Sequence, residues 1–142
     1  MTTIRHEINV SATPDAAFQA LTSQEGIEGW WAKDCDIGEG SGGEHELRFQ
    51  KEGQSVHMRF RVEEASPGKQ VTWRCVENGN PVWAGTTLSW KLESTGAGTS
   101  IDFSHSGFAE DQSPPYTMTV QGWQHFVGSL QAYLDGSAGQ PF

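Results

Sequence analysis

Cysteine and basic residues are both scarce in this sequence, and each shortage excludes a class of protein. Cys35 and Cys75 are the only cysteines in 142 residues. Their number and wide separation suit neither a secreted disulfide framework nor a zinc-binding motif, so we expect buried free thiols. Nine Lys and Arg are outweighed by 18 Asp and Glu, and the net charge of -9 disfavours binding to nucleic acid or to anionic lipid.

Long apolar stretches are missing as well. No segment approaches the roughly 20 apolar residues of a membrane-spanning helix, and the first residues show no charged-then-apolar leader. We therefore expect a cytoplasmic protein without a membrane span. The chain does contain six Trp and seven Phe, which argues against disorder, and its length suits a single domain that covers residues 1–142.

Apolar and polar residues alternate in five runs between residues 44 and 106, a pattern typical of strands with one buried face. The connectors, such as 66–69 and 78–80, are too short for a parallel crossover, which predicts an antiparallel sheet. Residues 4–10 add a sixth strand and residues 34–38 a seventh. The positions expected to face inward are His45, Leu47, Phe49; Val56, Met58, Phe60, Val62; Val71, Trp73, Cys75; Val82, Ala84, Thr86, Leu88, Trp90, Leu92; and Ile101, Phe103, His105.

Three segments follow the helical period instead. Residues 13–15 form a cap-like start, with Pro14 at the first helical position. A second short helix carries three residues on one face: Ile27, Trp30 and Trp31. The longest helix is expected at 113–134, and residues 136–142 are expected to fray.

These elements predict an α+β fold in which a curved antiparallel sheet of six to seven strands wraps around the long C-terminal helix. Six strands spaced about 4.8 Å apart make a sheet near 30 Å wide, whereas a helix with its side chains is about 10 to 12 Å across. One helix cannot cover such a face. The two short N-terminal helices must close the rest, or a pocket remains; a filled core is the alternative.

Four polar residues fall on the inward phase: His6, His45, Thr86 and His105. Each is either a core group paired with the backbone or a polar anchor in an apolar pocket. Several tryptophans share their face, which favours a pocket for an apolar or aromatic molecule. The predicted ligand-binding residues are Trp30, His45, Leu47, Phe49, Met58, Phe60, Trp73, Thr86, Trp90, His105, Trp123 and Phe126.

Reactive chemistry has little support. His45 and His105 are weak candidates for acid–base catalysis. Ser104 and Ser106 flank His105, but neighbours along a strand face opposite sides and cannot pair. No His-x-His or i, i+4 pair indicates a metal site, and the glycine-rich stretch 38–43 lacks the Lys-Ser/Thr of a phosphate-binding loop. We therefore expect no metal and no cofactor.

Several segments carry the motifs of a known family: the strand that ends at Val10, SATPDAAFQAL at 11–21, Trp30-Trp31, GGEHELRF at 42–49, EASPGK at 64–69, GTSIDF at 98–103, and Gly122-Trp123. Over nearly its whole length the chain resembles START-like (SRPBCC) domains, in particular the branch homologous to the activator of the heat-shock chaperone ATPase. The resemblance implies a helix-grip fold with a cavity between sheet and long helix. Members include lipid and hormone carriers, aromatic cyclases and chaperone partners.

The resulting hypothesis is a domain that binds a small apolar, aromatic or lipid-like ligand in an internal cavity, without catalysis. The first alternative is an enzyme of the cyclase or hydrolase type that uses a cavity histidine as acid or base. The second is a co-regulator of a chaperone ATPase, which we expect less because the chain shows no second domain. The sequence leaves open whether the chain forms a homodimer.

Overall fold

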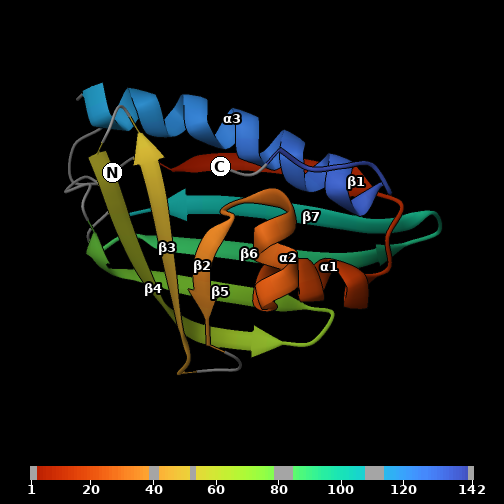
Figure 1. Cartoon of the computed structure of the whole chain (residues 1–142). Helices are drawn as coiled ribbons and strands as arrows, with labels where there is room; N and C mark the ends of the chain where they lie inside the picture. Colours follow the sequence, from red (N-terminus) through yellow and green to blue (C-terminus); the bar gives the residue numbers. More distant parts are fainter. Residues whose placement is uncertain (1–2, 39–41, 52–53, 79–84, 108–113, 141–142) are drawn as a thin grey trace.

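The computed structural model describes residues 3–38, 42–51, 54–78, 85–107 and 114–140 (Figure 1). The elements of this part follow in the order β1 (Ile4–Val10), α1 (Pro14–Thr22), α2 (Gln24–Trp30), β2 (Asp34–Ile37), β3 (Glu44–Lys51), β4 (Gln54–Ser66), β5 (Gln70–Asn78), β6 (Thr87–Thr95), β7 (Gly98–Ser106) and α3 (Pro114–Leu134). The α+β class, the long C-terminal helix and the two short N-terminal helices are confirmed. None of these helices has both the length and the apolar character to cross a bilayer.

The strands form one sheet of seven in the order β1-β7-β6-β5-β4-β3-β2, with every neighbouring pair antiparallel. The first strand returns to pair with the last, so that Ile4 lies opposite His105 and Val10 opposite Thr99. Figure 1 shows α3 lying across the curved sheet, with α1 and α2 beside it. α3 contacts β1, α2 contacts β2, and α1 contacts β5, β6 and β7. Between them the helices reach both edges of the sheet, as the helix-grip prediction required.

Local sequence signals set the starts of the two short helices. Thr13 caps α1, because its side-chain oxygen accepts a hydrogen bond from the Ala16 N–H at 3.2 Å, and Pro14 occupies the first turn. Ser23 caps α2 in the same way through the Gly26 N–H at 2.9 Å. Each helix therefore begins where a hydroxyl can bond a free backbone N–H.

The inward phases of the central strands are those that the alternation predicted. Val82 and Ala84 lie outside the described residues, and β6 begins at Thr87. Cys35 and Cys75 are buried free thiols, as expected. The buried hydrophobic positions of β3 to β7 are Leu47, Phe60, Val62, Val71, Trp73, Cys75, Leu88, Trp90, Leu92, Ile101 and Phe103.

A glutamine side chain meets each edge of the sheet. At the β2 edge, Gln24 donates from Nε2 to the Cys35 carbonyl at 2.6 Å, and its Oε1 accepts from the Ile37 N–H at 3.0 Å. At the β1 edge, Nε2 of Gln131 on α3 donates to the Asn9 carbonyl at 3.2 Å. Both amides therefore bond backbone groups that a further strand would use.

Residues 136–140 do not fray, so that prediction was wrong for this part of the tail. The Gln140 N–H donates to Ser129 Oγ at 2.6 Å, and the same hydroxyl donates to the Trp30 carbonyl at 2.7 Å. His125 Nε2 lies 2.9 Å from the Gln140 carbonyl. The tail folds back along α3 because the buried Ser129 hydroxyl supplies a hydrogen-bond partner for its backbone. The composition of the tail does not reveal this partner.

Replacing Ser129 with alanine removes the hydroxyl that joins α3, α2 and the tail. We expect the free energy of unfolding to fall by about 1 to 2 kcal/mol, and hydrogen exchange at the Gln140 amide to become faster. Ser137→Ala is the matched control, because Ser137 lies exposed in the same tail. Unchanged exchange at Gln140 in the Ser129 variant would contradict the proposed role of the hydroxyl.

Candidate functional site

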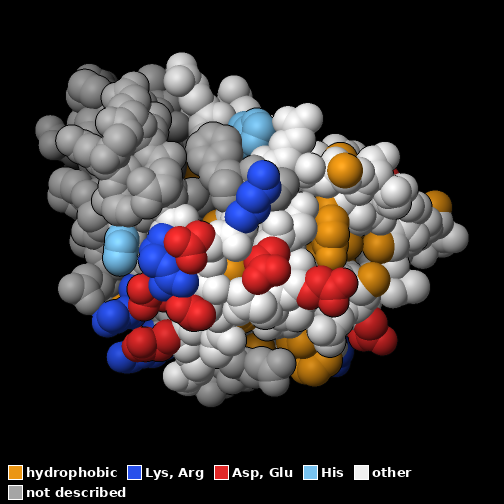
Figure 2. Space-filling view, in the orientation of Figure 1, with side chains coloured by type: hydrophobic (Ala, Val, Ile, Leu, Met, Phe, Trp, Pro, Cys, Tyr) orange, Lys and Arg blue, Asp and Glu red, His pale blue; other side chains and the backbone are white. Residues whose placement is uncertain are grey.

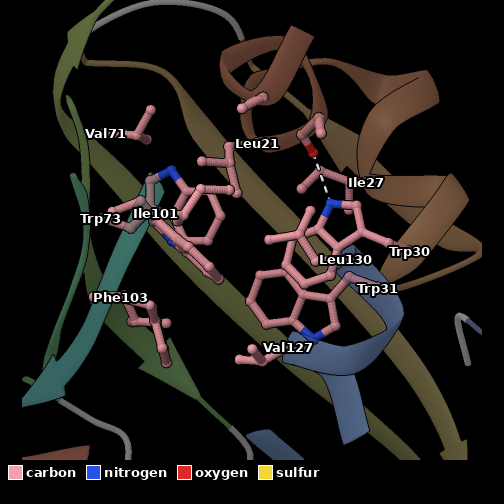
Figure 3. Packing of buried hydrophobic residues seen from close by; sticks show 14 of the residues in the cluster. Leu21, Ile27, Trp30, Trp31, Val71, Trp73, Ile101, Phe103, Val127 and Leu130 are labelled. Atoms are coloured by element: carbon pink, nitrogen blue, oxygen red, sulfur yellow. Dashed lines mark hydrogen bonds between the residues drawn. The ribbon is translucent and has the colours of Figure 1, made fainter. Parts of the chain in front are cut away.

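Aromatic rings from every layer occupy the space between the sheet and α3. Trp90 of β6 and Trp123 of α3 both pack on Phe103 of β7, with ring centroids 4.2 and 4.4 Å away. Trp30 of α2 meets Trp90 edge-on at 5.7 Å. Figure 3 shows part of this cluster, with side chains from the sheet, α2 and α3 pointing toward one another. The sequence left an open pocket and a filled core as alternatives, and rings fill much of this region.

Trp31 lies at the centre of the cluster. Its ring is nearly parallel to those of Trp30 and Trp73, with centroid distances of 5.3 and 5.6 Å and interplanar angles of 17° and 16°. It also contacts Phe60 on β4 at 5.5 Å and Trp123 on α3 at 5.4 Å. Trp31 directly follows the last residue of α2. A side chain from the α2–β2 connection therefore reaches both the sheet and α3.

His105 on β7 is bonded at both ring nitrogens. Trp123 donates its Nε1–H to Nδ1 at 3.0 Å, and Thr86 Oγ1 lies 2.8 Å from Nε2. An indole nitrogen can only donate, so Nδ1 carries no proton and the neutral ring has its proton on Nε2, facing Thr86. Burial lowers the pKa of His105 to about 3. The ring ties the sheet to α3, and neither nitrogen is free to exchange a proton with a ligand.

His45 on β3 is fully buried, and its ring centroid is 5.2 Å from that of Trp73. Neither ring nitrogen has a hydrogen-bond partner among the residues that the structure describes. Burial lowers the pKa of His45 to about 4; the backbone of Gly38 acts in the opposite direction but does not meet hydrogen-bond geometry with the ring. At pH 7 His45 is therefore neutral, with one donor and one acceptor unused.

Within the described part of the chain, the buried indole N–H groups of Trp73 and Trp90 also lack a partner. Trp30, by contrast, donates to the Ala20 carbonyl at 2.7 Å. Leaving a buried donor unpaired costs about 1 to 3 kcal/mol. The Trp73 ring lies 5.2 Å from His45 and 5.7 Å from Trp90, so Trp73 is next to both of the other side chains. We call His45, Trp73 and Trp90 the polar row.

The structure brings the predicted ligand-binding residues into one region. Leu47 is buried and lies opposite the half-buried Met58 in the β3–β4 register. The side chain of Phe49 lies outside what the structure describes. His6 is half-buried on β1 and stacks on Phe103 at 6.4 Å. The other members of the predicted set surround the ring cluster: Trp30, His45, Phe60, Trp73, Thr86, Trp90, His105, Trp123 and Phe126.

Two rings of the cluster were missing from the predicted ligand-binding set. Phe103 shares the inward phase of β7 with His105, a signal that the alternation already contained. Trp31 shares one helix face with Ile27 and Trp30 at i, i+3 and i+4 spacing, so the sequence already contained a signal for this ring as well.

A separate hollow of about 380 Å³ lies on the surface beside β2, lined by Gln24, Asp36, Ile37, Gly38, Glu44, Glu46 and Arg59. None of these belongs to the predicted set. Arg48 bonds the carboxylates of Asp34, Asp36 and Glu46 nearby at 2.9, 2.8 and 2.9 Å. Figure 2 shows acidic and basic side chains side by side on the surface. Among the described residues no cluster of three His, Cys, Asp or Glu could hold a metal ion.

A family model for "Activator of Hsp90 ATPase homolog 1-like protein" matches residues 11–135 of the chain. No match was found among curated proteins.

Solved structures share the fold. The solution structure of the Aha1 dimer from Colwellia psychrerythraea is 30% identical, with a TM-score of 0.79 and coverage of 95% of this chain and 97% of that one. A protein from Chromobacterium violaceum is 20% identical, with a TM-score of 0.79 and coverage of 95% and 99%. DynU16, a putative protein in the dynemicin biosynthetic locus, is 18% identical, with a TM-score of 0.73 and coverage of 94% and 47%. The last two likenesses show the fold alone.

Proposed function

This chain belongs to the family of Activator of Hsp90 ATPase homolog 1-like proteins, and from that premise we propose that it binds a small, uncharged aromatic molecule between the sheet and α3. The polar row is the observation that supports the proposal. Buried polar groups in folded proteins nearly always have a hydrogen-bond partner, and an unpaired one calls for a ligand or an ordered water. Here three neighbouring side chains, His45, Trp73 and Trp90, carry four such atoms.

The chemistry of the polar row favours one class of ligand. The two indole N–H groups can only donate, so they favour a molecule with oxygen acceptors. Neutral His45 adds one donor or one acceptor beside Trp73. No Asp, Glu, Lys or Arg is buried among the described residues, which favours an uncharged ligand. The surrounding tryptophan rings favour a flat aromatic body, because aromatic faces pack well against one another.

Coumarin and naphthalene make a matched pair of probes, since both are flat and bicyclic but only coumarin carries oxygen acceptors. We expect isothermal titration calorimetry to show coumarin binding more tightly than naphthalene. Trp73→Phe or Trp90→Phe keeps a ring and removes the N–H, and each is expected to weaken coumarin binding about five- to tenfold, with naphthalene unaffected.

Trp30→Phe is the control, because the Trp30 N–H is already bonded to Ala20. It is expected to leave the ratio of coumarin to naphthalene affinity unchanged. Equal coumarin binding by the wild type and both polar-row variants would mean that water satisfies the N–H groups, and the proposal would fail. Absence of binding by either probe would also count against it.

Acid–base catalysis by His45 is the second candidate function, because its ring nitrogens are unused within the interior. A base with a pKa of about 4 takes up a proton weakly at neutral pH, so a bound substrate would have to supply a favourable hydrogen bond. The test is whether the protein hydrolyses a coumarin-type lactone, measured as opening of the lactone ring. Activity retained in His45→Gln would exclude the histidine as catalyst.

The described surface gives less support to a function that depends on binding another protein. Val76, at 37% exposure, is the one large hydrophobic side chain that lies exposed among the described residues. Docking surfaces usually offer a contiguous apolar patch. Light scattering would show whether this chain forms a dimer, as the Colwellia protein does. A pull-down with a heat-shock chaperone ATPase would test whether this chain binds such a chaperone.

A further inference from the structure

Trp31 has the position and contacts that a flat ligand would have in the proposed site. Its ring stacks on Trp73, a member of the polar row, at 5.6 Å and 16°, and on Trp30 at 5.3 Å and 17°. Phe60, Trp123 and Phe126 complete its surroundings at 5.5, 5.4 and 6.3 Å. These neighbours come from α2, the sheet and α3. The slot around Trp31 therefore fits one flat bicyclic ring, and the protein fills it with its own side chain.

The attachment of Trp31 differs from that of its neighbours. Trp30 is held by a hydrogen bond to the Ala20 carbonyl, and Trp123 by one to His105. The Trp31 side chain is held by ring packing, and its backbone belongs to the short connection between α2 and β2. Moving the ring out of the slot therefore breaks ring packing but none of the side-chain hydrogen bonds that hold Trp30 and Trp123.

The location of the slot links it to the polar row. A ring that replaces Trp31 would lie against Trp73, whose centroid is 5.2 Å from that of His45 and 5.7 Å from that of Trp90. Such a ring would be stacked on a side chain whose N–H group is buried and unpaired among the described residues. The Trp31 indole has no oxygen acceptor to offer this group. A ligand with acceptors can therefore make bonds in this slot that Trp31 cannot.

We infer that the slot occupied by Trp31 is the aromatic subsite of the proposed binding site, and that a flat bicyclic ligand with acceptor oxygens enters by displacing the Trp31 ring. This inference rests on the proposed function. It makes Trp31 an internal competitor: only the fraction of molecules with the ring displaced binds ligand, so the apparent affinity of the wild type is reduced by that fraction. Removing the ring removes the competition.

Calorimetry with coumarin tests the competition directly. Trp31→Ala is expected to bind coumarin at least tenfold more tightly than the wild type, and Trp31→Phe to fall between them. Phe18→Ala is the matched control, because it deletes a half-buried ring on α1 that packs against the core outside the ring contacts described for Trp31. The control is expected to gain less than twofold. In Trp31→Ala combined with Trp73→Phe, most of the gain should disappear, since simple filling of a cavity would not depend on the Trp73 N–H.

The outcomes separate this inference from the function on which it rests. Coumarin binding of equal strength in the wild type and Trp31→Ala, or an equal gain in Phe18→Ala, would overturn the subsite and leave the binding function standing. Binding by none of the proteins would overturn both.

A second measurement does not depend on the alanine variant folding. With 5-fluorotryptophan in all six Trp positions, the Trp31 signal is identified by its loss in Trp31→Phe. In ligand-free protein we expect microsecond-to-millisecond exchange at Trp31, and none at Trp30 or Trp123. A Trp31 signal without exchange would contradict displacement of the ring.

Discussion

Replacing Trp123 with alanine is expected to lower the free energy of unfolding by about 5 kcal/mol, the largest effect of any single substitution considered for this chain. The ring packs on Phe103 at 4.4 Å and on Trp31 at 5.4 Å, so its loss opens a cavity between α3 and the sheet. The substitution also leaves His105 Nδ1 buried without its donor. Because domains are commonly stable by about 5 to 15 kcal/mol, urea denaturation should show a protein close to unfolding.

Two controls separate the ring from its N–H group. Trp123→Phe keeps an aromatic ring but cannot donate to His105, and we expect it to cost about 2 kcal/mol. Phe126→Ala removes a half-buried ring from the same helix and should cost clearly less than Trp123→Ala. A loss in Trp123→Ala no greater than that in Phe126→Ala would mean that α3 is anchored elsewhere.

Acidification from pH 7 to pH 5 is expected to lower the free energy of unfolding by about 4 kcal/mol, through His45 and His105. Burial lowers their pKa values from 6.5 to about 4 and about 3. Between pH 6.5 and these folded-state values the unfolded chain binds protons that the folded chain does not, so stability is lost as the pH falls. Each histidine contributes about 2 kcal/mol of that loss by pH 5.

Urea denaturation at intervals of half a pH unit measures this slope. Most carboxylates titrate below the window, so it is dominated by imidazole groups. His45→Leu removes one buried imidazole of similar size without breaking a hydrogen bond, because neither ring nitrogen has a partner. The variant should show about half of the wild-type loss between pH 7 and pH 5. Stability that stays level across this range in the wild type would show that the two rings are not buried in their neutral form.

The fold was predictable because its signals are local. Pro67 and Gly68 mark the turn between β4 and β5, where Gly68 has a φ of +71° and the Lys69 N–H bonds the Ser66 carbonyl at 2.9 Å. A capping hydroxyl starts each short helix, and alternation gives the inward face of each strand whatever its partner. None of these features depends on how distant segments come together, so each can be recognised within a few residues.

The inward phase of the candidate site residues could be predicted from the sequence, but the way in which they pair could not. His45 and His105 have the same inward phase on their strands, yet one is bonded at both nitrogens and the other at neither. The difference depends on how α3 is rotated over the sheet, which places Trp123 beside His105. The hydrogen bonds of Ser129 depend on where the tail returns along α3. Such contacts join segments far apart in the chain, and no local pattern encodes them.

The two glutamine amides at the sheet edges bear on how the molecule associates at high concentration. Open sheets are prone to growth by strand addition, in which the backbone of one molecule extends the ladder of another. At the β2 edge an incoming strand would first have to displace the Gln24 side chain. At the β1 edge it would have to displace the Gln131 side chain, which comes from α3. Strand addition would break two bonds between Gln24 and the β2 backbone, or one between Gln131 and the β1 backbone, before a new ladder forms. The two amides therefore disfavour growth of the sheet at either edge.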